Sequence, residues 1–169
     1  FLMIRRPPIS TLSSSSAASD VYKRQKYNNI RFFAKPFGRL LSESGGDIIG
    51  SNQYHFIMPV PLQVKRLRQR GYNQSLLVSK ELGRLWDTDV CFDALKRDRH
   101  TEPQAKLPLK HRYRNVRGAF SYRGPTLKGK SVLVVDDVFT TGATVGECAK
   151  VLKKNGAGVV DVLTIARTP

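Results

Sequence analysis

Acidic residues are scarce in this sequence. Its 169 residues include 13 Asp and Glu against 29 Lys and Arg, which gives a formal net charge of +16. A protein with this charge attracts anions such as nucleic acid, nucleotides or phosphorylated small molecules. The alternative is a basic surface that is simply solvated. Because the basic residues are spread along the chain, the charge alone does not choose between these interpretations.

Cysteines and long apolar runs are also lacking. The two cysteines, Cys91 and Cys148, form no CxxC pair, so the sequence indicates neither a disulfide framework nor a zinc site. We expect both to be small core residues in a reducing cytoplasm. No apolar run reaches the roughly 18 residues that a membrane-spanning helix needs. The 40% hydrophobic content is typical of a soluble globular protein.

The first 25 residues differ in composition from the rest. Residues 1–19 contain no acid, one Pro-Pro pair and a run of four serines. They lack the apolar core of about 7–15 residues that a secretory signal requires. Their Arg-Arg pair and serines fit a transit peptide, whereas residues 1–12 and 19–25 resemble translated sequencing-adapter sequence. We expect residues 1–25 to be an extraneous or disordered tail and residues 26–169 to form one domain.

The strongest local pattern lies near residue 136. Residues 132–135 are apolar and mostly β-branched, which predicts a strand buried on both faces, as in a parallel sheet. Asp136 and Asp137 follow at once, at the strand end where open α/β sheets place ligands. A stretch of small and hydroxyl-bearing residues comes next, and then an apolar stripe at helical spacing that ends near Gly156.

This order predicts chemistry at the strand end. A helix N-terminus binds phosphate through its N–H groups and its partial positive charge. Gly142 allows close backbone approach, and the neighbouring threonines add hydroxyl donors. The acidic pair can accept hydrogen bonds from sugar hydroxyls or hold a hydrated Mg²⁺. The pattern therefore fits a ribose 5-phosphate, with the phosphate at Thr140, Thr141, Gly142, Ala143 and Thr144.

Residues 132–144 resemble the phosphoribosyl-pyrophosphate (PRPP) motif of type I phosphoribosyltransferases. This resemblance implies an α/β fold with a mostly parallel central sheet flanked by helices, and the alternation of predicted strands and helices favours the same class independently. It also implies PRPP as ligand, Asp136 and Asp137 as catalytic residues, and Mg²⁺ held by these acids or by the substrate. The alternative is a buried strand and a Thr-capped helix that bind nothing.

A second basic segment follows a predicted strand over residues 55–61. Residues 62–74 contain four cations, and a helix is then predicted to about Trp86. We expect this helix to turn Val78, Leu82 and Leu85 inward and Lys80, Glu81 and Arg84 outward. The loop after the first strand of such a fold suits a second anion, pyrophosphate. A basic surface helix is the alternative for the four cations, which are Lys65, Arg66, Arg68 and Arg70.

The remaining elements are predicted from shorter patterns. Residues 26–50 favour one helix that ends at residues 44–46. Residues 93–96 favour a short strand, residues 118–123 an outer strand, and the valine-rich residues 158–165 the last parallel strand.

Several short segments are similar to the ComF family, whose members are phosphoribosyltransferase-like and linked to DNA uptake in competent bacteria. They are residues 59–62, 66, 70–74, 101–104, 112–116 and 118–120, within a similarity that covers residues 55–167. The similarity implies pyrophosphate binding by Arg66 and Arg70. It also implies a mobile loop over the pyrophosphate, formed from residues 97–118 and including Gln104, Arg112 and Asn115.

The family commonly carries an N-terminal cysteine zinc ribbon. This sequence contains none, so we expect no zinc in this fragment and a true N-terminus that is missing. The residues leave three functions open: a transferase acting on PRPP, a non-enzymatic competence factor that handles single-stranded DNA with other competence proteins, and a nucleotide-sensing regulator. They do not reveal the acceptor or the oligomeric state.

Overall fold

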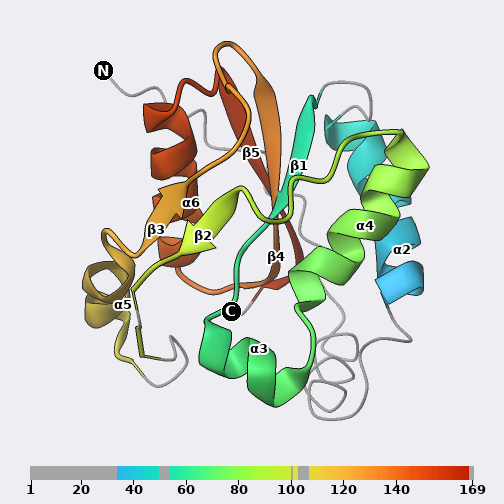
Figure 1. The fold of residues 1–169 in the computed structure, drawn as a ribbon. Coiled ribbons are helices and arrows are strands. Elements are labelled where there is room, and N and C mark those ends of the chain that lie inside the picture. Colours follow the sequence, from blue (N-terminus) through green and yellow to red (C-terminus); the bar gives the residue numbers. More distant parts are fainter. Residues whose placement is uncertain (1–33, 50–53, 100, 103–106, 168–169) are drawn as a thin grey trace.

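A parallel sheet forms the centre of the protein in a computed structural model that describes residues 34–49, 54–99, 101–102 and 107–167. Strands β1 (Phe56–Pro59), β4 (Ser131–Phe139) and β5 (Val159–Arg167) lie in the order β1-β4-β5, all parallel (Figure 1). The predicted α/β class and the predicted parallel strands are confirmed. The prediction for residues 1–25 falls outside the described residues.

Helices cover both faces of this sheet. Helices α2 (Ala34–Ile49) and α4 (Gln74–Trp86) pack on one face, and α6 (Ala143–Lys154) packs on the other (Figure 1). Along β4, Val132 and Val134 join the α6-side core, whereas Leu133 and Val135 join the core under α2 and α4. All four side chains are fully buried, as expected for a strand covered on both sides.

A second, smaller sheet lies on the α6 side. Strands β2 (Leu95–Arg97) and β3 (Phe120–Tyr122) pair antiparallel with each other and not with the central sheet. Both strands were predicted within a residue or two, but their separate pairing was not. Helix α5 (Leu109–Val116) lies between them in the chain, and α3 (Val64–Arg70) follows β1. Part of the predicted mobile loop is therefore helical.

The packing of α2 on α4 corrects two predictions for α4. Glu81, predicted to point outward, is 7% exposed, and Leu85, predicted to point inward, is 37% exposed. Val78, Leu82 and Trp86 form the buried stripe instead, and this leaves Leu85 at its margin. Glu81 faces α2, where the absence of a side chain at Gly38 makes room for it.

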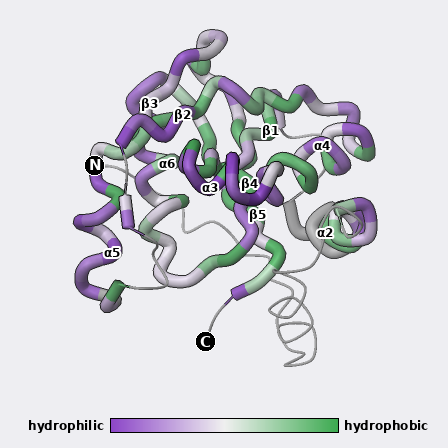
Figure 2. Tube along the Cα trace, turned by 60° about the horizontal axis from the view of Figure 1, so that its bottom comes forward, coloured by the Kyte–Doolittle hydropathy of each residue, from purple (hydrophilic) through white to green (hydrophobic). Residues whose placement is uncertain are grey.

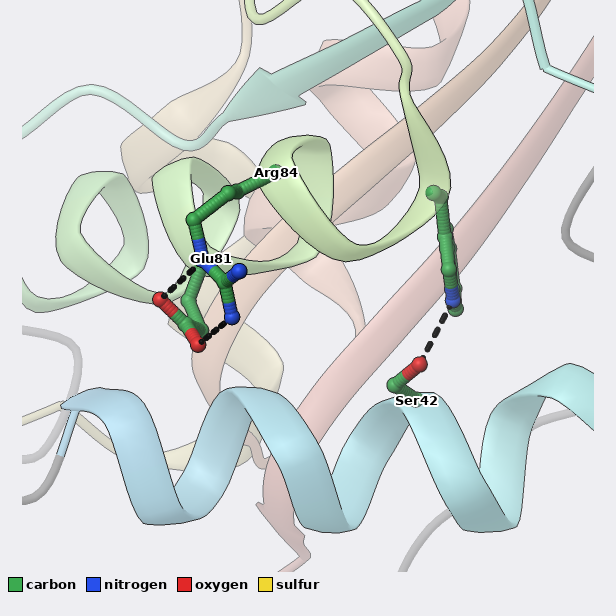
Figure 3. A network of polar contacts seen from close by, with 4 residues as sticks. Ser42, Glu81 and Arg84 are labelled. Carbon is green, nitrogen blue, oxygen red and sulfur yellow. Dashed lines mark hydrogen bonds and ion pairs between the residues drawn. The ribbon is translucent and has the colours of Figure 1, made fainter.

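A hydrogen bond joins the two helices, and an ion pair lies within α4 itself. Arg84 pairs with Glu81 at 2.8 Å, and the Trp86 indole donates a 2.7 Å hydrogen bond to the hydroxyl of Ser42 on α2 (Figure 3). Helix α2 also continues to Ile49, so the predicted end at residues 44–46 was wrong.

Two absences predicted from the sequence can be checked in the structure. In the ranges that the structure covers, no helix is long and apolar enough to cross a membrane. Cys148 is fully buried and Cys91 is half-buried, and both are free thiols. Burial raises the pKa of the Cys148 thiol, which keeps it protonated and unreactive.

Candidate functional site

The predicted acid pair and phosphate loop lie together at the carboxyl end of β4. The strand is longer than predicted: it runs to Phe139, so Asp136 and Asp137 belong to its last residues rather than following it. Asp136 lies beside Thr164 of β5 in the sheet register. Helix α6 begins at Ala143, directly after the loop of residues 140–142. This arrangement brings the acids and the helix N-terminus to one edge of the sheet.

Gly142 is the N-cap residue of α6 and has a left-handed backbone, with φ of 75°. A Cβ at this position would lie 2.9 Å from the ring of Phe139. Both the conformation and the contact therefore require glycine. The Thr141 hydroxyl accepts a long, 3.4 Å hydrogen bond from the Ala143 N–H. The result is a tight loop that leads straight into the positive end of a 12-residue helix.

Asp136 is held by groups from two elements. Its Oδ1 accepts a 2.8 Å hydrogen bond from the Asp137 N–H and a 3.4 Å hydrogen bond from the Ser75 hydroxyl. Ser75 stands in the first turn of α4. The acid pair is thereby positioned by the start of α4 as well as by its own strand.

Asn73 explains why α4 starts at this place. Its side-chain oxygen caps α4 by accepting from the Ser75 N–H at 3.0 Å, and its amide nitrogen donates to the Val60 carbonyl at 3.0 Å. Asn is a preferred N-cap residue for this reason. Two residues earlier, Gly71 ends α3 with φ of 74°, a left-handed conformation that favours glycine. The residues Arg70–Gln74 therefore connect α3 to α4, and the Asn73 side chain ties this connection to the residue that follows β1.

Arg66 and Arg97 interact electrostatically with the acid pair, and Arg70 interacts with Arg66. Arg66 and Arg70 lie four residues apart on the half-buried side of α3, whereas Arg68 is exposed. Burial lowers the pKa of Arg66. The positive charge of Arg70 lowers it further, whereas the negative charge of Asp137 raises it. Arg97, the last residue of β2, has its pKa lowered chiefly by burial; Arg66 adds to this, and Asp136 acts against it. Partly buried like charges at close range create a site that favours an anion.

Arg97 was not among the site residues predicted from the sequence. Its guanidinium stacks over the ring of Phe120 at 5.3 Å from the centroid and donates to the Thr101 hydroxyl. In the sequence it was one cation among many in residues 97–118. In the structure it pairs with Phe120 in the β2–β3 sheet, and its charge interacts with that of Asp136.

The predicted mobile-loop residues have structural partners within their own segment. The Asn115 side chain makes two hydrogen bonds with the backbone of Glu102, at 3.1 and 2.9 Å. The Arg112 Nε donates to the Leu107 carbonyl at 3.1 Å. Gln104 lies outside the described residues. The described part of this segment thus consists of helix α5 and of preceding residues that hydrogen bonds hold to it.

Helix α5 is attached to the phosphate loop. The Tyr113 hydroxyl donates a 2.7 Å hydrogen bond to the Thr141 carbonyl, and the Gly118 N–H donates to Glu147 of α6 at 2.8 Å. Helix α5 is hydrophilic along most of its length (Figure 2). In the same view the carboxyl end of β4 is turned forward, and α3 and α5 both lie toward the viewer. The site edge of the sheet is thus flanked by two basic helices.

Comparisons with known proteins agree with this geometry. The chain matches the phosphoribosyl transferase domain family over residues 76–169. Competence protein F of Haemophilus influenzae is 35% identical over 154 residues, which cover 88% of this chain and 67% of that protein. The DNA utilization protein YhgH of Escherichia coli K12 is 40% identical over 112 residues, which cover 66% of this chain and 49% of that protein. The chain thus spans about half the length of YhgH.

A shorter match and the solved structures complete the comparison. The transcriptional regulator GfcR of Methanosphaera stadtmanae is 46% identical over 59 residues, which cover 33% of this chain and 30% of that protein. Glutamine PRPP amidotransferase from B. subtilis has a TM-score of 0.54 at 20% identity, covering 80% of this chain and 26% of that one. This structural likeness shows the type I phosphoribosyltransferase fold. Motif, fold and sequence identity together show that the chain belongs to the ComF family of phosphoribosyltransferase-like proteins.

Proposed function

We propose that the protein binds PRPP, or a related ribose 5-phosphate, at the carboxyl end of β4. The observation that carries this proposal is that the acid pair at the end of β4 and the glycine-capped N-terminus of α6 lie at one edge of the sheet, where the charges of Arg66 and Arg97 interact with those of Asp137 and Asp136 respectively. The α6 N-terminus would receive the 5-phosphate. The two carboxylates would accept hydrogen bonds from the ribose hydroxyls, and the arginines would bind the pyrophosphate group.

Magnesium fits this site as a partner of the ligand. Among the residues that the structure describes, no group of three or more His, Cys, Asp or Glu side chains could hold a metal ion. Mg²⁺ usually binds through one or two carboxylates together with substrate phosphates. Asp136 and Asp137 supply that number of carboxylates. The ion would neutralise charge on the bound pyrophosphate group.

The same arrangement suits transfer of the ribosyl group to a nitrogen nucleophile. Negative charge develops on the departing pyrophosphate, where Arg66, Arg70 and Arg97 would stabilise it. Asp136 and Asp137 would orient the ribose through its hydroxyls. This fold also serves proteins that bind without catalysing. We therefore propose ligand binding first and transferase activity second.

A PRPP titration by calorimetry, with and without Mg²⁺, tests the binding proposal directly. Saturable binding that is strengthened by Mg²⁺ is expected, and ribose 5-phosphate and pyrophosphate should each compete with PRPP. Pyrophosphate release in the presence of common bases then tests catalysis, with Asp137→Asn as the inactive control. A folded protein that binds none of the three ligands would refute the proposal.

A second candidate function is the binding of single-stranded nucleic acid beside the same site. The observation that favours it is the set of exposed cations on and after α5, which flanks the site: Lys110, Arg114 and Arg117. The name DNA utilization protein, carried by YhgH, agrees with this candidate. Backbone phosphates would contact these cations with little regard to base sequence.

A further inference from the structure

Thr101 is buried within an otherwise exposed stretch of chain. It is 3% exposed, although Arg99 and Glu102 beside it are exposed. Its hydroxyl accepts a hydrogen bond from the Gln63 amide at 3.1 Å and another from the Arg97 guanidinium. The same Gln63 amide also donates to the Thr101 carbonyl. A threonine with this many partners is fixed in one orientation.

The two partners of Thr101 belong to different parts of the site. Gln63 is the N-cap residue of α3, and its carbonyl accepts from the Leu67 N–H at 2.9 Å. Its side chain makes no cap bond, because it is engaged with Thr101. Arg66 follows one turn later on the same helix. Arg97 ends β2 and shares the field of Asp136. Thr101 therefore joins the helix that carries Arg66 to the strand that carries Arg97.

Thr101 itself is anchored from the other side. The Arg99 guanidinium donates to the carbonyls of Asn115 and Arg117, at 2.9 and 2.8 Å. Asn115 holds the backbone of Glu102 with two hydrogen bonds. Arg99 and Glu102, on either side of Thr101, are therefore hydrogen-bonded to the end of α5. These bonds hold the backbone at Thr101 in place.

We propose that Thr101 is a positioning residue for the anion site, which holds α3 and Arg97 at a fixed separation before any ligand arrives. Guanidiniums that repel one another would otherwise turn toward solvent, and binding would then have to order them again. Thr101 would act through Gln63 and Arg97 and not touch the ligand. This inference rests on the proposed anion-binding function.

The affinity test uses Thr101→Val, which keeps the shape of the side chain and removes the hydroxyl, beside Thr101→Ser, which restores it. Inorganic pyrophosphate is the probe. We expect Thr101→Val to weaken pyrophosphate binding about tenfold, the size of a lost hydrogen bond to a charged donor, and Thr101→Ser to bind like the unsubstituted protein. Thr88→Val is the matched control, because the Thr88 hydroxyl bonds only the local carbonyl of Trp86.

Amide hydrogen exchange without ligand gives a second, independent measurement. Thr101→Val should speed exchange in α3, including the Leu67 N–H, and leave α6 unchanged; Thr101→Ser should not. Unchanged α3 exchange together with unchanged pyrophosphate affinity would overturn the inference. Failure of the unsubstituted protein to bind pyrophosphate would contradict the proposed function instead, and the exchange rates would then decide alone whether Thr101 holds α3.

Discussion

The Tyr113 hydroxyl on α5 donates a 2.7 Å hydrogen bond to the Thr141 carbonyl in the loop before α6. Thr141 directly precedes Gly142, the left-handed N-cap residue of α6. The shape of the proposed phosphate loop therefore depends on a helix from the basic segment. This hydrogen bond connects two parts of the site that are 28 residues apart in the sequence.

Tyr113→Phe should weaken PRPP binding by a fewfold. The change removes only the hydroxyl that holds the Thr141 carbonyl, and a neutral hydrogen bond contributes about 1 kcal/mol. Tyr122→Phe is the matched control, because its hydroxyl bonds the Pro125 carbonyl at 2.6 Å, outside the phosphate loop. Calorimetric titration of both variants measures the effect. Equal affinities would show that α5 does not shape the loop.

Gly142→Asp should lower PRPP affinity by on the order of 100-fold or more, because a carboxylate would stand where the phosphate is expected. Gly142→Ala separates the steric contribution, since its Cβ also meets the Phe139 ring. Gly129→Asp controls for backbone strain: Gly129 has φ of 70°, and a Cβ there meets nothing within 4 Å. PRPP titrations of the folded variants provide the measurement. Normal affinity in Gly142→Asp would remove the 5-phosphate from this loop.

Arg66→Gln should weaken pyrophosphate binding by about 10- to 100-fold, through loss of charge-assisted hydrogen bonds. The free protein should not lose stability, because the change also removes repulsion between Arg66 and Arg70. Arg68→Gln is the control, since Arg68 is on the exposed side of the same helix. Thermal melting and titration are both needed. A similar loss of affinity in the two variants would indicate a general charge effect and not a defined site.

Single-stranded DNA binding should respond to one group of exposed cations and not to another. If phosphates contact the α5 region, neutralising three cations there should make the slope of log affinity against log salt shallower by up to ~2 units. The test substitutes with Gln the residues Lys110, Arg114 and Arg117. The matched control substitutes three exposed cations outside the α5 region, Lys128, Lys150 and Lys154. Equal slopes for both triple variants would argue against a DNA surface at α5.

Gly38→Ala should destabilise the protein although alanine favours helices. Its Cβ would lie 2.5 Å from the Cγ of Glu81, and overpacking of this kind costs about 1–3 kcal/mol. Gly146→Ala in α6 is the control: its Cβ meets nothing within 4 Å, so it should gain about 0.5–1 kcal/mol. Urea unfolding measures both. A stabilised Gly38→Ala variant would mean that α2 can shift on α4 without loss.

Helix α4 shows how far hydrophobic periodicity can predict which side chains are buried. Its existence, its end at Trp86 and the buried Val78 and Leu82 were all predicted from periodicity. Glu81 and Leu85 were assigned to the wrong sides, because their exposure depends on how α2 lies against the helix. A periodic pattern identifies an apolar stripe, but it carries no information on a second helix that covers a polar flank.

The sequence by itself determined the β4 strand, the acids at its end, the small and hydroxyl-bearing loop that leads into α6, and the family of the chain. These are properties of neighbouring residues, which fix local backbone geometry and the order of chemical groups. Only the tertiary structure decided that Arg97 stacks on Phe120 within the range of Asp136's charge, that Thr101 bridges Gln63 and Arg97, and that Tyr113 holds Thr141. Each of these contacts depends on the pairing of β2 with β3 and on the docking of α5 against α6, which are set by packing between segments distant in sequence.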